Sequence, residues 1–144
     1  MNTRRCRGMF IALTVATATL TAVRASAAPA SDWVQAGRVN GDDGITIFVD
    51  MDSMIDAGPG RIRTWIRYRN DRPDQNGILE SLAYEQLDCA RDFHATISLF
   101  NYSVDGHVVS SEKEEAEDED PIIPGSILAG ILPFTCAAHG LQAR

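Results

Sequence analysis

The sequence predicts an α+β fold that is mostly β: a single antiparallel sheet of about six strands, with a short C-terminal helix packed on one face and one disulfide. Three observations predict it. Turn-forming residues recur at short intervals, β-branched and aromatic runs lie between them, and an apolar segment near the C terminus follows a helix N-cap signal. The 144 residues have the length of one domain, so sheet and helix should share a core.

The first two predicted strands flank a cluster of turn residues. Trp33–Val39 reads as a short strand, and residues 40–44, Asn-Gly-Asp-Asp-Gly, break the chain. Ile45–Val49 follows as a β-branched and aromatic run, which is typical of a strand. The two strands are therefore expected to pair as a hairpin.

The third predicted strand, Arg61–Asn70, alternates between two kinds of side chain, as a strand with one solvated face does. One face is expected to point into the core: Ile62, Thr64, Ile66 and Tyr68. The other face carries four arginines and a tryptophan: Arg61, Arg63, Trp65, Arg67 and Arg69.

Three more strands complete the predicted sheet. Residues 72–77 form a hairpin loop, after which Ile78–Cys89 is the fourth strand. Thr96–Val104 and His107–Ser110 are the fifth and sixth. The Asp-Gly pair at residues 105–106 joins them, and it is typical of a tight hairpin with two positive-φ positions.

The character of the chain changes after the sixth strand. Residues 112–120 hold seven acids, which predicts an exposed loop or frayed helix. Ser126 is a candidate N-cap for an apolar helix over Ile127–Leu132, which Pro133 is expected to end or kink. Residues 137–144 are expected to form a flexible tail.

The N-terminal residues indicate export. Three arginines precede an uncharged apolar run over residues 9–23, and Ala25-Ser26-Ala27 matches a signal-peptidase site. A membrane anchor is the alternative, but the run is shorter than the ~20 apolar residues that a span requires. We therefore predict a signal peptide over residues 1–27 and one β-rich domain over residues 28–144, located in the periplasm or on the outer cell surface, with no transmembrane segment after processing.

The charge and the cysteines of the exported domain narrow its chemistry. Residues 1–27 hold four of the thirteen basic side chains and no acid, so nine basic and twenty acidic side chains remain, a formal net charge of −11. Such an acidic domain should repel nucleic acid. Cys89 and Cys136 are the two remaining cysteines, and an even pair in an exported domain predicts a disulfide. A catalytic or metal-binding thiol pair is the rival, but no C-x-x-C is present.

Several short patterns, taken in order, resemble the surface-adhesin protein E family of proteobacterial exported proteins. They cover nearly the whole exported domain: Trp33-Val34, residues 47–53 (Ile-Phe-Val-Asp-x-Asp-Ser), the strand around Trp65, Leu87-Asp88-Cys89, residues 102–109, Pro124-Gly125-Ser126 and Cys136. The resemblance implies a β-sheet domain with a C-terminal helix, a disulfide at the matching cysteines, a possible homodimer and attachment to host or matrix proteins.

The most distinctive candidate site is the face formed by Arg61, Arg63, Trp65, Arg67 and Arg69. Arginine and tryptophan are enriched at binding hot spots, and guanidinium groups suit carboxylate or sulfate. The alternative is a solvated face whose arginines stack on Trp65 and pair with cross-strand Glu80 or Glu85. In a third possibility, the acidic run folds over this face and neutralises it.

No pattern in the sequence points to catalysis, a cofactor or a metal. His94, His107 and His139 lack neighbouring ligands at useful spacing, and residues 50–53 read as a turn capped by Asp50 or Ser53. We therefore expect an exported non-enzymatic binding protein whose partner is a host matrix or envelope protein. The alternative is a periplasmic protein that binds or inhibits an envelope enzyme.

Overall fold

The computed structural model describes residues 31–41, 44–113 and 118–141. The predicted signal peptide, residues 1–27, lies outside the described residues. So do residues 42–43 of the first turn, residues 114–117 of the acidic run and the last three residues of the predicted tail.

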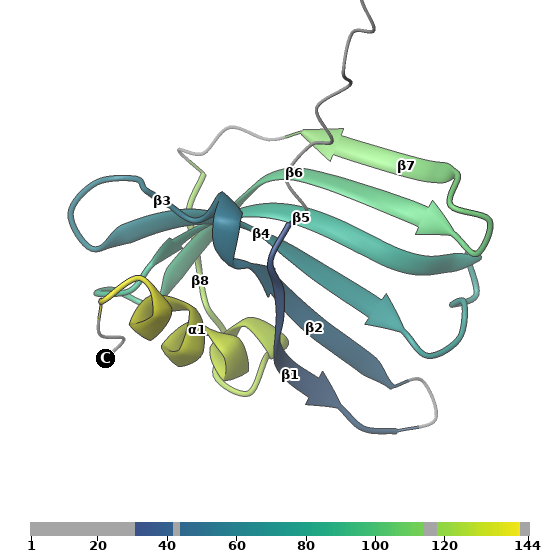
Figure 1. The fold of residues 1–144 in the computed structure, drawn as a ribbon, viewed down its shortest axis with the longest axis horizontal. Coiled ribbons are helices and arrows are strands. Elements are labelled where there is room, and N and C mark those ends of the chain that lie inside the picture. The colour runs from purple at the N-terminus through teal and green to yellow at the C-terminus, as the bar shows by residue number, and fades with distance from the viewer. Residues whose placement is uncertain (1–30, 42–43, 114–117, 142–144) are drawn as a thin grey trace, which may run out of the picture.

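The described residues form one antiparallel sheet with a helix against one face, as the sequence predicts (Figure 1). The main path has six strands, in spatial order β1 (Trp33–Val39), β2 (Ile45–Asp50), β4 (Arg61–Asn70), β5 (Ile78–Asp88), β6 (Phe93–Ser103) and β7 (Val108–Lys113). Two short strands extend it: β3 (Ile55–Asp56) pairs with β4, and β8 (Asp120–Pro121) pairs with β6. The helix α1 spans Ile127–Ala138.

The hydrophobic core lies between the sheet and α1. Ile62, Thr64 and Ile66 of β4 are fully buried, whereas Trp65 between them is only half-buried, which confirms the alternation predicted for this strand. Strands β2 and β5, the segment after β8 and the helix supply the rest of the core: Ile47, Leu87, Cys89, Ile122, Ile131, Leu132 and Cys136. The sheet thus has one covered face and one open face.

A single turn of 3₁₀-helix, η1 (Met51–Ser53), links β2 to the strands beyond it. Asp50 caps the turn by accepting from the backbone N–H of Asp52. The Ser53 hydroxyl donates to the Asp50 carbonyl (2.9 Å) and accepts the backbone N–H of Trp65 (3.0 Å). Strands β2 and β3 pair with successive parts of the same edge of β4, and Trp65 lies in the gap between them. The Ser53 hydroxyl therefore supplies the acceptor that the backbone N–H of Trp65 would otherwise lack. Asp50 and Ser53 both cap local backbone, as predicted.

Replacing Ser53 by alanine should lower the free energy of unfolding by about 2 kcal/mol, because the partly buried Trp65 N–H loses its acceptor. Urea unfolding of residues 28–144 measures this. The control is Ser111→Ala, at an exposed position of β7, which should change stability by less than about 0.5 kcal/mol. Equal stabilities for the two variants would contradict the role given to Ser53.

The hairpin between β6 and β7 forms where it is predicted but with another turn geometry. Gly106 has positive φ (77°), whereas Asp105 does not. The Gly106 N–H donates to the Ser103 carbonyl (3.0 Å), and the Ser103 N–H donates to the His107 carbonyl (2.9 Å). This is a three-residue loop with a single glycine in the left-handed region, so the prediction of two positive-φ positions is wrong.

The helix begins as predicted but runs through Pro133. The Ser126 hydroxyl caps it by accepting the Ala129 N–H (3.2 Å). Pro133 cannot donate the usual helical hydrogen bond. The helix nevertheless continues to Ala138, because buried residues anchor it on both sides of the proline: Ile131 and Leu132 before it, Thr135 and Cys136 after it. Of the two outcomes predicted for Pro133, an end of the helix at Leu132 is therefore wrong.

The disulfide between Cys89 and Cys136 forms as predicted and ties α1 to the end of β5. The first residues of the predicted tail, which follow Cys136, are also held in place. Residues 137 and 138 belong to the helix, and Leu141 packs against the core and donates its backbone N–H to the Cys136 carbonyl (2.8 Å). The described part of the predicted tail is thus attached to the fold, because the disulfide holds the residues just before it.

Candidate functional site

The open face of the sheet, opposite α1, gathers aromatic side chains from strands far apart in the sequence. The register places Trp65 opposite Tyr84, and Leu82 opposite Phe100. Because side chains two residues apart share a face, Tyr102 follows Phe100 onto the same surface. We call this surface the aromatic face and define it by Trp33, Phe48, Trp65, Leu82, Tyr84, Phe100 and Tyr102.

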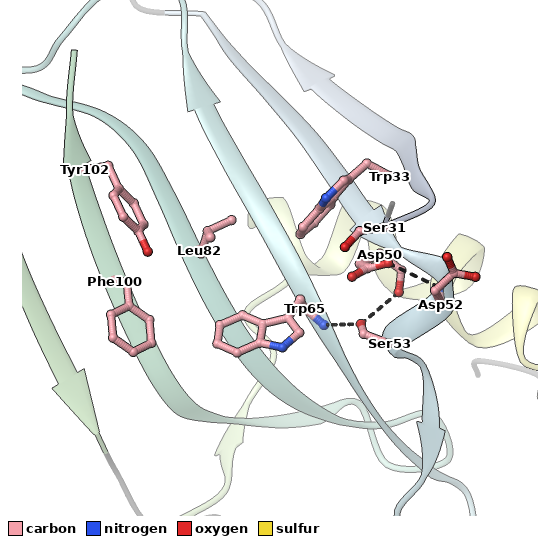
Figure 2. Close-up of a pocket in the computed structure, with 9 residues that line it drawn as sticks. All are labelled: Ser31, Trp33, Asp50, Asp52, Ser53, Trp65, Leu82, Phe100 and Tyr102. Atoms are coloured by element: carbon pink, nitrogen blue, oxygen red, sulfur yellow. Dashed lines mark hydrogen bonds between the residues drawn. The ribbon is translucent and has the colours of Figure 1, made fainter. Parts of the chain in front are cut away.

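Part of the aromatic face is hollowed. The hollow has a volume of about 690 Å³, and Figure 2 shows Trp33, Trp65, Phe100 and Tyr102 arranged around Leu82. The ring centroid of Trp65 lies 5.0 Å from that of Tyr84 and 6.2 Å from that of Phe100. At the end nearest η1, the lining is polar: Ser31, Asp50, Asp52 and Ser53.

Arg67 lies flat on this surface and does not project from it. Its guanidinium carbon is 4.0 Å from the ring centroid of Trp33 and 5.9 Å from that of Phe48, a cation–π arrangement. Its Nε is buried, has no hydrogen-bond partner among the described residues, and lies 3.8 Å from a carboxylate oxygen of Glu80. Arg67 therefore stacks on Trp33, and not on Trp65, the ring that the alternative of a solvated face predicts.

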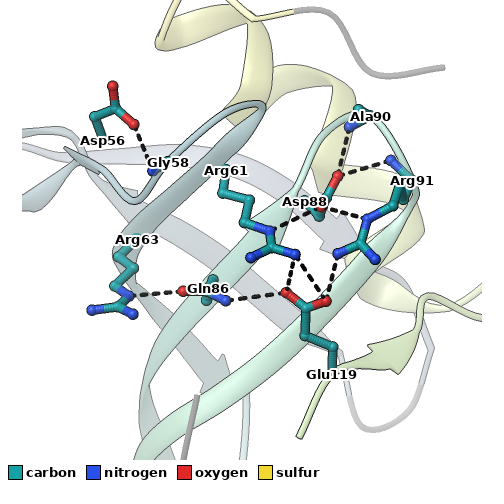
Figure 3. A network of polar contacts seen from close by, with 9 residues as sticks. All are labelled: Asp56, Gly58, Arg61, Arg63, Gln86, Asp88, Ala90, Arg91 and Glu119. Carbon is teal, nitrogen blue, oxygen red and sulfur yellow. Dashed lines mark hydrogen bonds and ion pairs between the residues drawn. The ribbon is translucent and has the colours of Figure 1, made fainter. Parts of the chain in front are cut away.

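Two more arginines of the predicted binding face are held in a polar network at the other end of β4 (Figure 3). Arg61 donates to Asp88 (3.1 Å) and pairs with Glu119 (3.2 Å). Arg63 donates to the Gln86 side chain (2.9 Å), which itself donates to Glu119 (3.2 Å). Arg69 is the exposed arginine of this strand.

Asp88 is the centre of that network. Its side chain is buried, and it accepts hydrogen bonds from the backbone N–H groups of Ala90 and Arg91 and from the Arg61 and Arg91 guanidinium groups. Burial alone would raise the pKa of this carboxyl, but the hydrogen bonds from Arg91 and Arg61 outweigh burial and hold its pKa below the ordinary value. The network therefore keeps a charged carboxylate at the end of β5, next to the disulfide.

Of the two acidic partners predicted for the arginines, Glu80 pairs with Arg67, whereas Glu85 does not pair with any arginine of the face. Glu85 lies on the covered side, where it is buried, and accepts from the Thr96 hydroxyl (2.8 Å). It is therefore no partner for an arginine of the open face. The acidic run supplies Glu119 to Arg61 and Arg91, so its described end neutralises one arginine of the face. The run is also shorter than predicted as a loop, because β7 includes Glu112 and β8 includes Asp120.

A buried carboxylate and a histidine form a second polar cluster, on the covered side. Glu85 lies 3.2 Å from Nδ1 of His94. That hydrogen bond raises the pKa of His94 against the opposing effect of burial, and the charges of Glu85 and Asp120 add to the rise. Burial first, and then the charge of Glu85, raises the pKa of the neighbouring Tyr68 hydroxyl.

The His94–Glu85 pair should make stability depend on pH. The pKa of His94 is higher in the folded state than its ordinary value of 6.5. The contribution of the pair to the free energy of unfolding is therefore complete below pH 6.5, and it is lost as pH rises through the folded pKa of His94. Urea unfolding at a series of pH values should therefore show a difference between wild type and His94→Gln that shrinks above pH 6.5. A difference that grows with pH would contradict the assignment.

Sequence reasoning missed most of the aromatic face. It found Trp65 but not Trp33, Leu82, Phe100 or Tyr102. The alternating pairs Leu82/Tyr84 and Phe100/Tyr102 were a usable signal, because side chains two residues apart on neighbouring strands share one face. What was missing was the register that places these pairs beside Trp65.

The described ranges contain neither a metal-binding cluster nor a membrane-spanning helix. No three histidine, cysteine, aspartate or glutamate side chains come together there as a metal site would require. None of the described helices has the length and apolar character needed to cross a membrane.

The described residues thus form a sheet that a disulfide ties to its helix, with one face covered and a hollow of aromatic rings on the other. The family model described as surface-adhesin protein E matches residues 33–137, most of the chain, so this protein belongs to the surface-adhesin protein E family. Membership makes it an exported, surface-adhesin-like protein. Neither the curated proteins nor the solved structures contain a match.

Proposed function

We propose that this chain is a non-enzymatic adhesin that captures a protein partner with its aromatic face, and that the partner is a host or matrix protein. The proposal rests on one observation above all. The covered face is filled by α1, whereas the open face presents a hollow of about 690 Å³ lined by two tryptophans, a phenylalanine and a tyrosine. Aromatic side chains in such hollows are typical anchors of protein interfaces.

In this proposal the arginines of β4 contribute less to partner binding than the sequence suggests. Arg61 is paired with Asp88 and Glu119, and Arg67 is stacked on Trp33, so neither guanidinium is presented for a partner. Of the other members of the predicted face, Trp65 lines the hollow, and Arg63 and Arg69 are the arginines that we place at the edge of the contact. The aromatic rings therefore supply the affinity in this proposal, and the exposed arginine supplies orientation.

The test is a pull-down with residues 28–144 as bait, offered host matrix and bacterial envelope extracts in parallel. The face variant is Trp65→Ala with Phe100→Ala, which removes two walls of the hollow. The matched control is Val39→Ala with Ile123→Ala, which removes two exposed apolar side chains that do not line the hollow. Urea unfolding of each bait confirms that the variants are folded.

We expect matrix proteins to be retained by wild type and by the control variant, and to be lost with the face variant. Retention of matrix proteins by the face variant would overturn the assignment of the site. Retention of a single envelope protein, and of nothing from matrix, would favour the alternative function, a periplasmic protein that binds an envelope enzyme. Capture of a second copy of the same chain from the envelope extract, and of no other protein, would favour a homodimer.

A further inference from the structure

The charged residues that line the hollow are all acidic. Two carboxylates, those of Asp50 and Asp52, line the end next to η1, and none of the residues that line the hollow is basic. Asp52 is exposed, whereas Asp50 is buried, and Figure 2 shows the two side chains next to each other. A ligand that enters the hollow therefore meets negative charge at one end and ring faces along its sides.

The rings themselves favour a positive charge. The face of an aromatic ring carries partial negative charge and attracts ammonium and guanidinium groups. The chain already uses this property beside the hollow, where the Arg67 guanidinium lies 4.0 Å from the centroid of Trp33. Leu82 and the ring carbons also suit the apolar stem of a long basic side chain.

An anionic ligand fits less well. Arg61 and Arg63 already bind Asp88, Gln86 and Glu119, and the buried Nε of Arg67 is not accessible from solvent. The chain after residue 27 carries a formal net charge of −11, from nine basic and twenty acidic side chains. Its overall field therefore attracts a basic partner and repels an acidic one.

We infer that the hollow receives an arginine or lysine side chain from a basic segment of the partner, with its charge at Asp52 and its stem against Trp65, Leu82 and Phe100. This inference rests on the proposed function and adds the chemistry that the aromatic face selects. It makes recognition of the partner depend on Asp52, a residue that the arginine-centred view of the face leaves out.

The two tryptophans give a direct readout, because the sequence contains only Trp33 and Trp65 and both line the hollow. The probes are three peptides of equal length, built from glycine and serine around a central arginine, norleucine or glutamate. Each is titrated into residues 28–144 at constant ionic strength while tryptophan emission is recorded. We expect saturable binding that is tightest for the arginine peptide and weakest for the glutamate peptide.

Three variants test the contacts. Asp52→Asn keeps an oxygen that can accept the Asp32 N–H and should weaken arginine-peptide binding about fivefold, the upper range for an exposed ion pair. Phe100→Leu keeps apolar bulk but loses the ring face, and should weaken binding of the same peptide about threefold. Glu112→Gln makes the same charge change at an exposed position of β7, outside the hollow, and should leave binding unchanged.

In the peptide titrations, three results would overturn the inference: equal binding of the three peptides, tightest binding of the glutamate peptide, or no saturable response from any peptide. Among the variants, equal effects of Asp52→Asn and Glu112→Gln on arginine-peptide binding would also overturn it. An emission change that follows protein concentration instead of peptide would place a second copy in the hollow, and would overturn it too. The pull-down separates the two proposals. If Asp52→Asn retains the partner as wild type does while the face variant loses it, the proposed function stands and this inference fails.

Discussion

Replacing Cys89 and Cys136 by alanine should lower the free energy of unfolding by about 4 kcal/mol, the largest stability effect that we expect of any change to this chain. The disulfide closes a loop of 47 residues and so restricts the unfolded chain. It also holds α1 on the sheet, where the helix must keep its hydrogen-bonded turns on both sides of Pro133. Net stabilities of single domains are about 5–15 kcal/mol, so this loss is a large share of the total.

The measurement is urea unfolding of residues 28–144 for wild type and for the double alanine variant. Wild type in the presence of a reductant is the control, because it removes the bond but keeps both sulfur atoms. Both samples should unfold at lower urea than oxidised wild type. A loss below about 1 kcal/mol in both would show that packing of Ile131 and Leu132 holds the helix without the bond.

Truncating two leucines of the same strand should affect different properties: mainly stability for Leu87 and mainly partner retention for Leu82. Leu87 is fully buried under α1, whereas Leu82 lies on the opposite side of β5 and lines the hollow. Leu87→Ala should cost about 3 kcal/mol of stability, because it leaves a cavity in the core. Leu82→Ala should cost about 1 kcal/mol, because its side chain is only half-buried, but it should weaken partner retention.

Urea unfolding and the pull-down, applied to both variants, give this comparison. Each leucine serves as the control for the other, because the strand and the substitution are the same. Equal losses of stability for both variants would mean that the aromatic face is also covered in the folded protein. In that case the division into a covered and an open face would be wrong.

The fold was predictable because its signals are local. The alternation of Arg61–Asn70 specifies a strand with two unlike faces, and Ser126 marks the start of the helix. The cysteine pair follows from composition and export. Each of these features depends on residues close in sequence or, for the disulfide, on the number of cysteines after residue 27.

The errors arose where distant residues decide the outcome. A proline inside a helix is locally unfavourable, but the buried Thr135 and Cys136 beyond Pro133 keep the helix intact. Thr135 also donates its hydroxyl to the Ile131 carbonyl across the proline (2.9 Å). Likewise, contact between the acidic run and the arginine face was only one of three possibilities in the sequence, because the pair Arg61 and Glu119 joins residues far apart along the chain.

The candidate site was only half predictable for the same reason. The sequence shows that Trp65 and the arginines share a face, since they alternate within one strand. It does not show that Trp33, Phe100 and Tyr102 come beside them, because that depends on the register of β1, β5 and β6. The interpretation therefore moved from an arginine face to an aromatic one.

The central claim is that a captured partner covers the aromatic face, and fluorine NMR tests it directly. Residues 28–144 labelled with 5-fluorotryptophan give two signals, one from Trp33 and one from Trp65, and single Trp→Phe variants assign them. An unlabelled partner contributes no signal. We predict that both resonances shift or broaden when the captured partner is added. Two unchanged resonances, with the partner shown to be bound, would contradict the account.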